Sequence, residues 1–193
     1  MLLFEHPGNQ NTAQALQIAL QCAMRQHTDL LVASTTGATA LALEEMAGHR
    51  QFHGNLICVT HANGWVEKGV SEISAQTVQT LTAKQVTVLT ATHALSGAER
   101  SLSTVFRGIY PAEIMAATLR MFGQGVKVCV EIAAMAADSG KLAYGQPVVC
   151  VAGSARGADT VCLLTPAHTA AILETKIHEI LCKPALDLPT RQP

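Results

Sequence analysis

Aromatic and charged residues are scarce in this sequence. Phe, Trp and Tyr make up 4% of its 193 residues, and Asp, Glu, Lys and Arg make up 14%. Hydrophobic residues make up 49%, so the chain is too apolar to remain disordered. Because aromatic rings are few, we expect a core of aliphatic side chains, methionine and cysteine. The length suits one domain, and we expect residues 1–193 to form a single domain.

An excess of positive charge is also missing. The formal net charge is −1, and Lys and Arg are scattered without forming a run. A protein that binds a nucleic acid duplex needs a basic stripe to displace counterions. We therefore expect neither nucleic acid nor a membrane surface as a partner. No apolar run reaches the ~20 residues that span a bilayer.

The cysteines lack metal-binding and redox motifs. None of the six is spaced as Cys-x-x-Cys, and most lie inside apolar runs such as Ile57-Cys58-Val59. Buried, reduced thiols behave as small hydrophobic side chains. Reduced thiols, together with the lack of an evident signal peptide, predict a cytoplasmic protein.

What the chain does contain is a regular alternation of short apolar runs and helical stretches. The runs do not alternate with polar residues, which is typical of strands covered on both faces. They span residues 2–4, 30–33, 56–59, 86–89, 148–152, 161–164 and 177–181. Apolar residues at helical spacing or helix start and stop signals predict helices at 12–26, 39–47, 74–83, 111–122 and 126–138. This order favours an α/β three-layer sandwich with a mostly parallel, mixed sheet.

Three segments carry further expectations. The connection 165–176 is short, which allows one antiparallel strand. Helix 126–138 is apolar nearly all round and is expected to be buried, whereas Lys127 and Glu131 are expected to form an exposed pair worth only ~0.3–0.5 kcal/mol. Residues 91–110 show little regular pattern and are predicted to be a long functional loop. Within it, Arg100 and Arg107 could each reach a phosphate or lie in solvent.

Polar residues gather in the loops that follow four of the expected strands. In open parallel sheets, ligands bind beyond the carboxyl ends of the strands, so these loops are the candidate site. The candidate binding residues are Ser34, Thr35, Thr36, Gly37, Ala38, Thr39, His61, Asn63, Gly64, His93, Ser96, Gly97, Gly153, Ser154, Asp159 and Thr160.

The first of these loops predicts a phosphate cradle. In residues 34–39, four hydroxyl side chains surround Gly37 directly before a helix. The free N–H groups and the positive dipole end of a helix start attract an anion, and glycine lets the backbone approach it. The alternative is that Ser34 or Thr36 only caps the helix. A cap needs one hydroxyl and this loop offers four, so we favour phosphate binding.

The histidines that follow strands are candidate acid–base groups. His61 and His93 are expected at one edge of the sheet, and His168 joins them if the strand before it is parallel. No close ligand spacing and no carboxylate near His61 or His93 is apparent, so we predict no metal. Trp65 either anchors its loop or stacks on a flat ligand ring. Asp159 either accepts from a sugar-like hydroxyl or caps a turn.

Several motifs resemble a known family. The stretch Leu31-Val32-Ala33-Ser34-Thr35-Thr36-Gly37-Ala38-Thr39-Ala40, followed by Ile57-Cys58-Val59-Thr60, is similar to the C-terminal domain of pyruvate kinase. In that domain a strand leads into a Ser/Thr-x-Ser/Thr-Gly-x-Ser/Thr-Ala loop and a helix. Residues 92–97, 113–115, 127–132 and 165–168 resemble stand-alone proteins of bacteria and archaea that are similar to this domain. The resemblance covers nearly the whole chain.

The resemblance implies a mixed sheet of five or six strands between helices, and it suggests flavin mononucleotide (FMN) as a candidate cofactor. In regulated pyruvate kinases the corresponding loop binds a sugar-phosphate effector. Here Ala38 stands where many of them have a basic residue, so a doubly phosphorylated sugar is not expected. The catalytic barrel of pyruvate kinase is absent from this sequence, so we do not expect a pyruvate kinase.

Two functions remain open from the sequence. The first is a protein that binds a phosphorylated small molecule, such as FMN or another nucleotide, on the loop 34–39. The second is an enzyme that uses His61 or His93 in the same pocket, either a flavin-dependent oxidoreductase or a phosphate-ester enzyme. The sequence leaves a homo-oligomer open as well.

Overall fold

A computed structural model describes residues 1–186, and in this part of the chain the strands form one mixed sheet of seven strands. Its strands are β1 (Leu2–Phe4), β2 (Asp29–Ala33), β3 (Leu56–Thr60), β4 (Thr87–Thr90), β5 (Val148–Ala152), β6 (Thr160–Thr165) and β7 (Lys176–Pro184). The order across the sheet is β1-β7-β6-β5-β2-β3-β4. Strand β6 is antiparallel to both of its neighbours, and all other pairs are parallel. The mostly parallel sheet is confirmed, and it is larger than the five or six strands that the resemblance implied.

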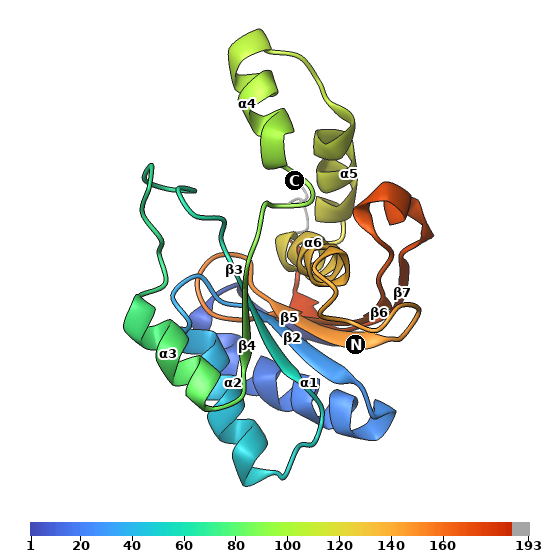
Figure 1. Ribbon diagram of the computed structural model, residues 1–193. Coiled ribbons are helices and arrows are strands. Elements are labelled where there is room, and N and C mark those ends of the chain that lie inside the picture. The colour runs from blue at the N-terminus through green and yellow to red at the C-terminus, as the bar shows by residue number, and fades with distance from the viewer. Residues whose placement is uncertain (187–193) are drawn as a thin grey trace.

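Helices cover both faces of the sheet (Figure 1). Helices α1 (Thr12–Gln26), α2 (Ala38–His49) and α3 (Ala75–Ala83) lie on one face, and α6 (Gln124–Asp138) lies on the other. Each face has its own apolar core, built from aliphatic, alanine and cysteine side chains as the composition predicts. Helix α5 (Pro111–Arg120) packs on α6, and the chain also forms the 3-10 turns η1 (Asn9–Asn11) and η2 (Thr169–Glu174). The three-layer α/β sandwich is confirmed.

Most predicted elements are present within one to three residues at each end, but the segment 91–110 is not a loop. It contains α4 (Gly97–Phe106), which stands away from the sheet in Figure 1. None of its residues is buried. The apolar residues of α4, Leu102, Val105 and Phe106, lie only in its second half, so the periodic stretch is too short to give a clear signal.

Helix α6 is buried, as its apolar composition predicts, but the expected exposed ion pair is wrong. The Lys127 and Glu131 side chains are only 6% and 5% exposed, and the Lys127 Nζ lies 2.5 Å from the Glu131 Oε2. Because α6 lies between the sheet and α5, it has almost no solvent face on which an exposed pair could sit.

The chain leaves the parallel neighbours β2 and β5 toward opposite sides of the sheet. After β2 the chain continues through α2 to β3, whereas after β5 it turns back through β6 on the other side of β2. The loops after β2 and β5 therefore leave in opposite directions and open a crevice between their carboxyl ends. This crevice is where the candidate residues of these two loops meet.

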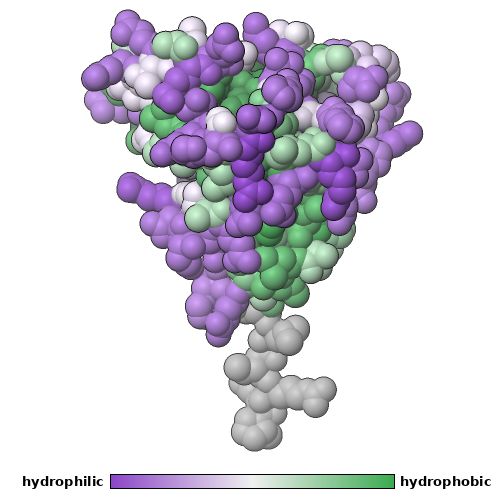
Figure 2. All heavy atoms as spheres, turned by 90° about the horizontal axis from the view of Figure 1, so that it is seen from below, coloured by the Kyte–Doolittle hydropathy of each residue, from purple (hydrophilic) through white to green (hydrophobic). Residues whose placement is uncertain are grey.

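The surface seen from below Figure 1 is mainly polar, with hydrophobic side chains showing between the polar ones in a central strip (Figure 2). All six cysteines are free and buried. Within residues 1–186, no helix combines the length and the apolar character that a membrane crossing needs.

Candidate functional site

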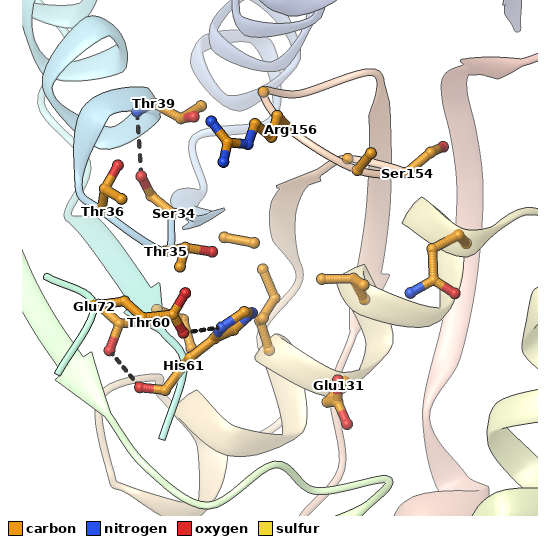
Figure 3. Close-up of a pocket in the computed structure, with 18 of the residues that line it drawn as sticks. Ser34, Thr35, Thr36, Thr39, Thr60, His61, Glu72, Glu131, Ser154 and Arg156 are labelled. Atoms are coloured by element: carbon orange, nitrogen blue, oxygen red, sulfur yellow. Dashed lines mark hydrogen bonds and ion pairs between the residues drawn. The ribbon is translucent and has the colours of Figure 1, made fainter. Parts of the chain in front are cut away.

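A cavity of about 880 Å³ occupies the carboxyl ends of β2, β3 and β5 (Figure 3). Four segments that are distant in sequence surround it: the loop 34–39, the loop after β3, residues 93–100 and the loop 153–157. Side chains from α5 and α6 close it on the remaining side. The structure thus brings together parts of all four strand-end loops that the sequence singled out.

The loop 34–39 leads directly into α2. The first helical hydrogen bond of α2 runs from the Leu41 N–H to the Gly37 carbonyl at 2.9 Å. The N-cap residue of α2 is Gly37, and the Ser34 hydroxyl, three residues earlier, accepts from the Thr39 N–H at 3.2 Å, so Ser34 satisfies one N–H of the first turn as a cap does. The N–H groups of Ala38 and Ala40, in the same first turn, lack an acceptor within the helix. These N–H groups remain available for an anion.

The hydroxyls of Thr35 and Thr36 are not used for capping and belong to the cavity lining. Figure 3 shows them beside Ser34 and Thr39 around the start of α2. Capping therefore accounts for one of the four hydroxyls of the loop. The arrangement fits both interpretations of the sequence at once, with Ser34 holding the turn and the threonines facing the cavity.

Gly37 is required by the backbone of this turn. Its φ is +87°, in the left-handed region that favours glycine. A Cβ at this position would lie 2.4 Å from the Thr77 Cγ2 on α3. Gly37 is buried behind the turn and does not line the cavity. Its contribution is to fix the direction in which α2 starts.

Arg156 faces the loop 34–39 from the loop after β5 (Figure 3). Its guanidinium has no ion pair or hydrogen bond within residues 1–186. The loop is compact, because a Cβ on Gly153 would lie 2.3 Å from the Gly157 carbonyl oxygen. Gly157 also presses against the start of α1, where the Ala158 N–H donates to the Thr12 hydroxyl at 3.0 Å.

Asp159 and Thr160 stabilise this loop from the protein interior and do not line the cavity. Both residues are buried, with exposures of 0% and 1%. The Asp159 carboxylate accepts from the N–H groups of Ser154 and Gly8 and from the Thr160 hydroxyl. The Ser154 hydroxyl donates to the same carboxylate, and Asp159 is fully buried outside the cavity, so it is not placed to accept from a sugar hydroxyl. Of the two roles expected for Asp159, its contacts therefore fit the capping of a turn.

His61 is paired with a carboxylate that the sequence did not suggest. Its Nδ1 lies 2.6 Å from the Glu72 Oε2, and both side chains line the cavity. A carboxylate accepts the Nδ1 proton and leaves the Nε2 lone pair free. Figure 3 shows the His61 ring pointing into the cavity. The expectation that no carboxylate accompanies His61 or His93 is wrong, since Glu131 also lies near His93.

His93 is held as a neutral ring. Burial lowers its pKa, the nearby Glu131 opposes this, and His61, Lys127 and Arg100 lower the pKa further. The Ala62 N–H donates to the His93 Nε2 at 3.3 Å, which places the ring proton on Nδ1. That Nδ1 lies 3.8 Å from the Glu131 Oε2. The rings of His61 and His93 are 5.2 Å apart, as expected for one edge of the sheet.

Trp65 joins two of the surrounding segments, the loop after β3 and residues 93–100. Its ring stacks on His93, with centroids 4.0 Å apart and planes 4° apart, and the Arg100 guanidinium lies 4.3 Å from its centroid. These contacts occupy the ring and support the anchoring interpretation of Trp65. Arg100 lines the cavity, whereas Arg107 is the C-cap residue of α4 and does not line the cavity.

The cavity wall carries more positive than negative groups. Its basic side chains are Arg100, Arg120, Lys127 and Arg156, and its carboxylates are Glu72 and Glu131. Both carboxylates already have partners, Glu72 in His61 and Glu131 in Lys127 and the Leu95 N–H. The cavity therefore favours an anionic ligand.

Other candidate residues lie elsewhere. Gly37, Asn63, Gly64, Gly97, Asp159 and Thr160 do not line the cavity. His168 is also apart from it, because the antiparallel β6 carries the chain to the opposite edge of the sheet. There its Nδ1 lies 3.2 Å from the Asp138 Oδ1. Partial burial raises the pKa of Asp138, but hydrogen bonds from Thr169 and His168 bring it below its usual value.

Arg156 and Glu72 are among the lining residues that sequence reasoning missed, together with Arg120, Lys127 and Glu131 from α5 and α6. Arg156 is the only Lys or Arg in residues 34–39, 60–65, 90–97 and 153–160, and this signal could have identified it. Glu72 follows His61 by eleven residues of irregular chain, and no pattern connects the two. Within residues 1–186, no group of three or more His, Cys, Asp or Glu side chains is placed to hold a metal ion.

The fold and the site together define an α/β sandwich with a hydroxyl-rich loop and helix start at the reversal point of a mixed sheet. A family model described as pyruvate kinase, alpha/beta domain, matches residues 13–164. This range covers well over half of the 193 residues. The chain belongs to the family of the pyruvate kinase alpha/beta domain.

Proposed function

We propose that this protein binds a phosphorylated small molecule, with the phosphate on the loop 34–39 at the start of α2. The observation that carries the proposal is the convergence of three kinds of group on one space. The free N–H group of Ala38, the hydroxyls of Thr35 and Thr36, and the Arg156 guanidinium all belong to residues that surround it. Each of these groups donates hydrogen bonds or carries positive charge, as a phosphate requires.

FMN is the candidate that fits both the proposed phosphate site and the volume of the cavity. Drug-sized ligands occupy pockets of ~300–1,000 Å³, and the cavity has about 880 Å³. His61, His93 and Ser96 line the same cavity and would contact the remainder of the ligand. The six buried free thiols fit a reducing compartment such as the cytoplasm.

The first experiment separates phosphate from ring recognition. Binding of FMN and of riboflavin, which lacks the phosphate, is measured by calorimetry, with inorganic phosphate as a competitor. We expect FMN to bind and riboflavin to bind much more weakly. Equal affinity for the two flavins would contradict the phosphate site. If neither flavin binds, sugar phosphates and nucleotides are tested with inorganic phosphate as the common competitor.

Variants then locate the phosphate. Thr36→Glu places a carboxylate in the proposed site and should abolish binding, while Thr82→Glu, on an exposed position of α3, should not. Arg156→Ala removes a charge-assisted hydrogen bond and should weaken binding about 10- to 150-fold. Arg50→Ala at the other end of α2 is its control. Unchanged affinity in both Thr36→Glu and Arg156→Ala would refute the assignment.

A second candidate function is an enzyme that uses the same cavity, and the His61–Glu72 contact favours it. A histidine oriented by a carboxylate is a common arrangement for a general base. A flavin-dependent oxidoreductase would be purified with yellow colour and would bleach with NADH or NADPH. A phosphate-ester enzyme would release inorganic phosphate. In either case His61→Gln should remove turnover while ligand affinity remains, and wild-type protein without either activity would exclude this candidate.

A further inference from the structure

Helix α4 carries an apolar stripe that nothing in residues 1–186 covers. Leu102, Val105 and Phe106 are spaced by three and four residues, so they lie on one side of the helix. Ile109, just beyond the helix end, extends the stripe. The exposed fraction rises from 41% at Leu102 to 83% at Ile109. Residues spaced in this way are the anchors of helices that dock in grooves of other proteins.

The same chain has an apolar groove of about 370 Å³ between α5 and η2. Its lining is almost entirely hydrophobic and includes Leu95, Met115, Leu119 and Ile172. At its rim, Ile114 is 55% exposed and Leu173 is 87% exposed. The stripe on α4 and this groove lie on either side of α5, and α4 does not line the groove.

We propose that two copies of this chain form a dimer in which α4 of each copy docks in the groove of the other. The chain itself supplies both halves of the contact, a helix with anchor spacing and a groove of apolar lining. The stripe and the groove also carry opposite charges beside them, because Arg107 lies at the end of α4 and Glu174 lies at the end of η2. The contact is reciprocal, so it closes at two copies.

The available area is sufficient for a stable dimer. Taking roughly 200 Å² for a fully exposed large apolar residue, the stripe and the groove rim expose about 800 Å² per copy and about 1,600 Å² for two copies. Stable interfaces bury ~1,200–2,000 Å² in total.

Docking also explains how a helix without buried residues can form part of a ligand cavity. Ser96, directly before α4, and Arg100, in its first turn, line the cavity, and Arg100 contacts Trp65. In one copy alone, no part of residues 1–186 buries the opposite side of α4. The partner's groove would bury it and hold this wall of the cavity in place. The dimer contact is therefore coupled to the cavity, although it does not depend on the identity of the ligand.

The test measures molecular mass in solution by light scattering over a range of protein concentrations. One chain has a mass of 20.3 kDa, and we expect twice this mass at concentrations above ~1 µM. Phe106→Glu on the stripe and Leu173→Glu at the groove should each weaken association at least 30-fold or so, as loss of a central anchor does. Val66→Glu is the control, since Val66 is 74% exposed and lies outside both surfaces.

A mixing experiment then tests the pairing itself. In a mixture of the Phe106→Glu and Leu173→Glu proteins, one intact stripe can meet one intact groove, so heterodimers should form where neither variant alone dimerises. Circular dichroism establishes that each variant is folded. If one is not, Val105→Ser replaces Phe106→Glu on the stripe, and Ile114→Ser replaces Leu173→Glu at the groove. A wild-type monomer at high concentration, an open-ended series of larger species, or a mixture without heterodimers would each overturn the proposal.

Discussion

At His93, burial and the surrounding positive charges act in the same direction on the ring. Burial, His61, Lys127 and Arg100 all lower its pKa, and only Glu131 opposes them. An unfolded histidine has a pKa near ~6.5. Between the two pKa values the unfolded chain therefore binds more protons than the folded protein, and the free energy of unfolding must fall as the pH is lowered through this interval.

We accordingly predict that the protein loses stability below about pH 6.5, and that His93→Gln removes this part of the pH dependence. Urea unfolding at several pH values measures the effect, and His53→Gln, at an exposed position, is the control. Trp65 provides a second measurement. It is the only tryptophan and stacks on His93, so its fluorescence should be quenched when His93 is protonated. Identical pH profiles for wild type and His93→Gln would contradict the prediction.

At the scale of single elements, the start of α2 depends on one glycine. Gly37 combines a φ of +87° with a close approach to Thr77. Gly37→Ala is therefore expected to lower the free energy of unfolding by ~1–3 kcal/mol. Gly48→Ala is a matched control in the same helix, where an added Cβ meets nothing within 4 Å, and it should stabilise the protein by ~0.5–1 kcal/mol. Equal effects of the two substitutions in denaturant titrations would show that the turn is not strained by a side chain.

Helix α6 depends on its buried ion pair. Glu131→Leu leaves the Lys127 ammonium buried without its partner, which we expect to cost ~3–5 kcal/mol. Adding Lys127→Met should recover a large part of this loss, because no unpaired charge then remains. On the exposed pair Lys84–Glu44, the substitution Glu44→Leu should change stability by only ~0–1 kcal/mol. A double variant no more stable than Glu131→Leu would show that the pair is not the source of the loss.

At the scale of the whole molecule, the cysteines report on the integrity of both cores. Burial raises the pKa of Cys58 to about 12, and burial is also the first cause that raises the pKa of Cys182 to about 12. The thiolate is the reactive form, so none of the six thiols should react with a disulfide reagent within minutes at pH 8 in the folded protein. All six should react in guanidinium chloride. Rapid reaction of any thiol in the native protein would show that its core opens readily.

Sequence reasoning was most successful where local pattern and burial agree. The seven strands and five of the helices follow from apolar runs and helical periodicity, because an element with a buried face must show that face in its residues. Helix α4 was missed because its apolar residues occupy only its second half, which makes the periodic stretch short. The Lys127–Glu131 pair was misplaced because burial of a charge depends on neighbours from distant parts of the chain. The α2 start was predicted because its chemistry is local, with Ser34, Thr36 and Gly37 adjacent in sequence.

The sequence by itself determined the α/β class, the polar strand ends and the hydroxyl-rich turn before α2, since each depends on a few consecutive residues. Only the tertiary structure decided which loops meet. The order β5-β2-β3 sets Arg156 opposite the turn, and the antiparallel β6 places His168 at the other edge. The irregular chain after β3 folds so that Glu72 reaches His61. Arg156 and the turn are about 120 positions apart in sequence, and their proximity is fixed by sheet order and strand direction, which no local pattern encodes.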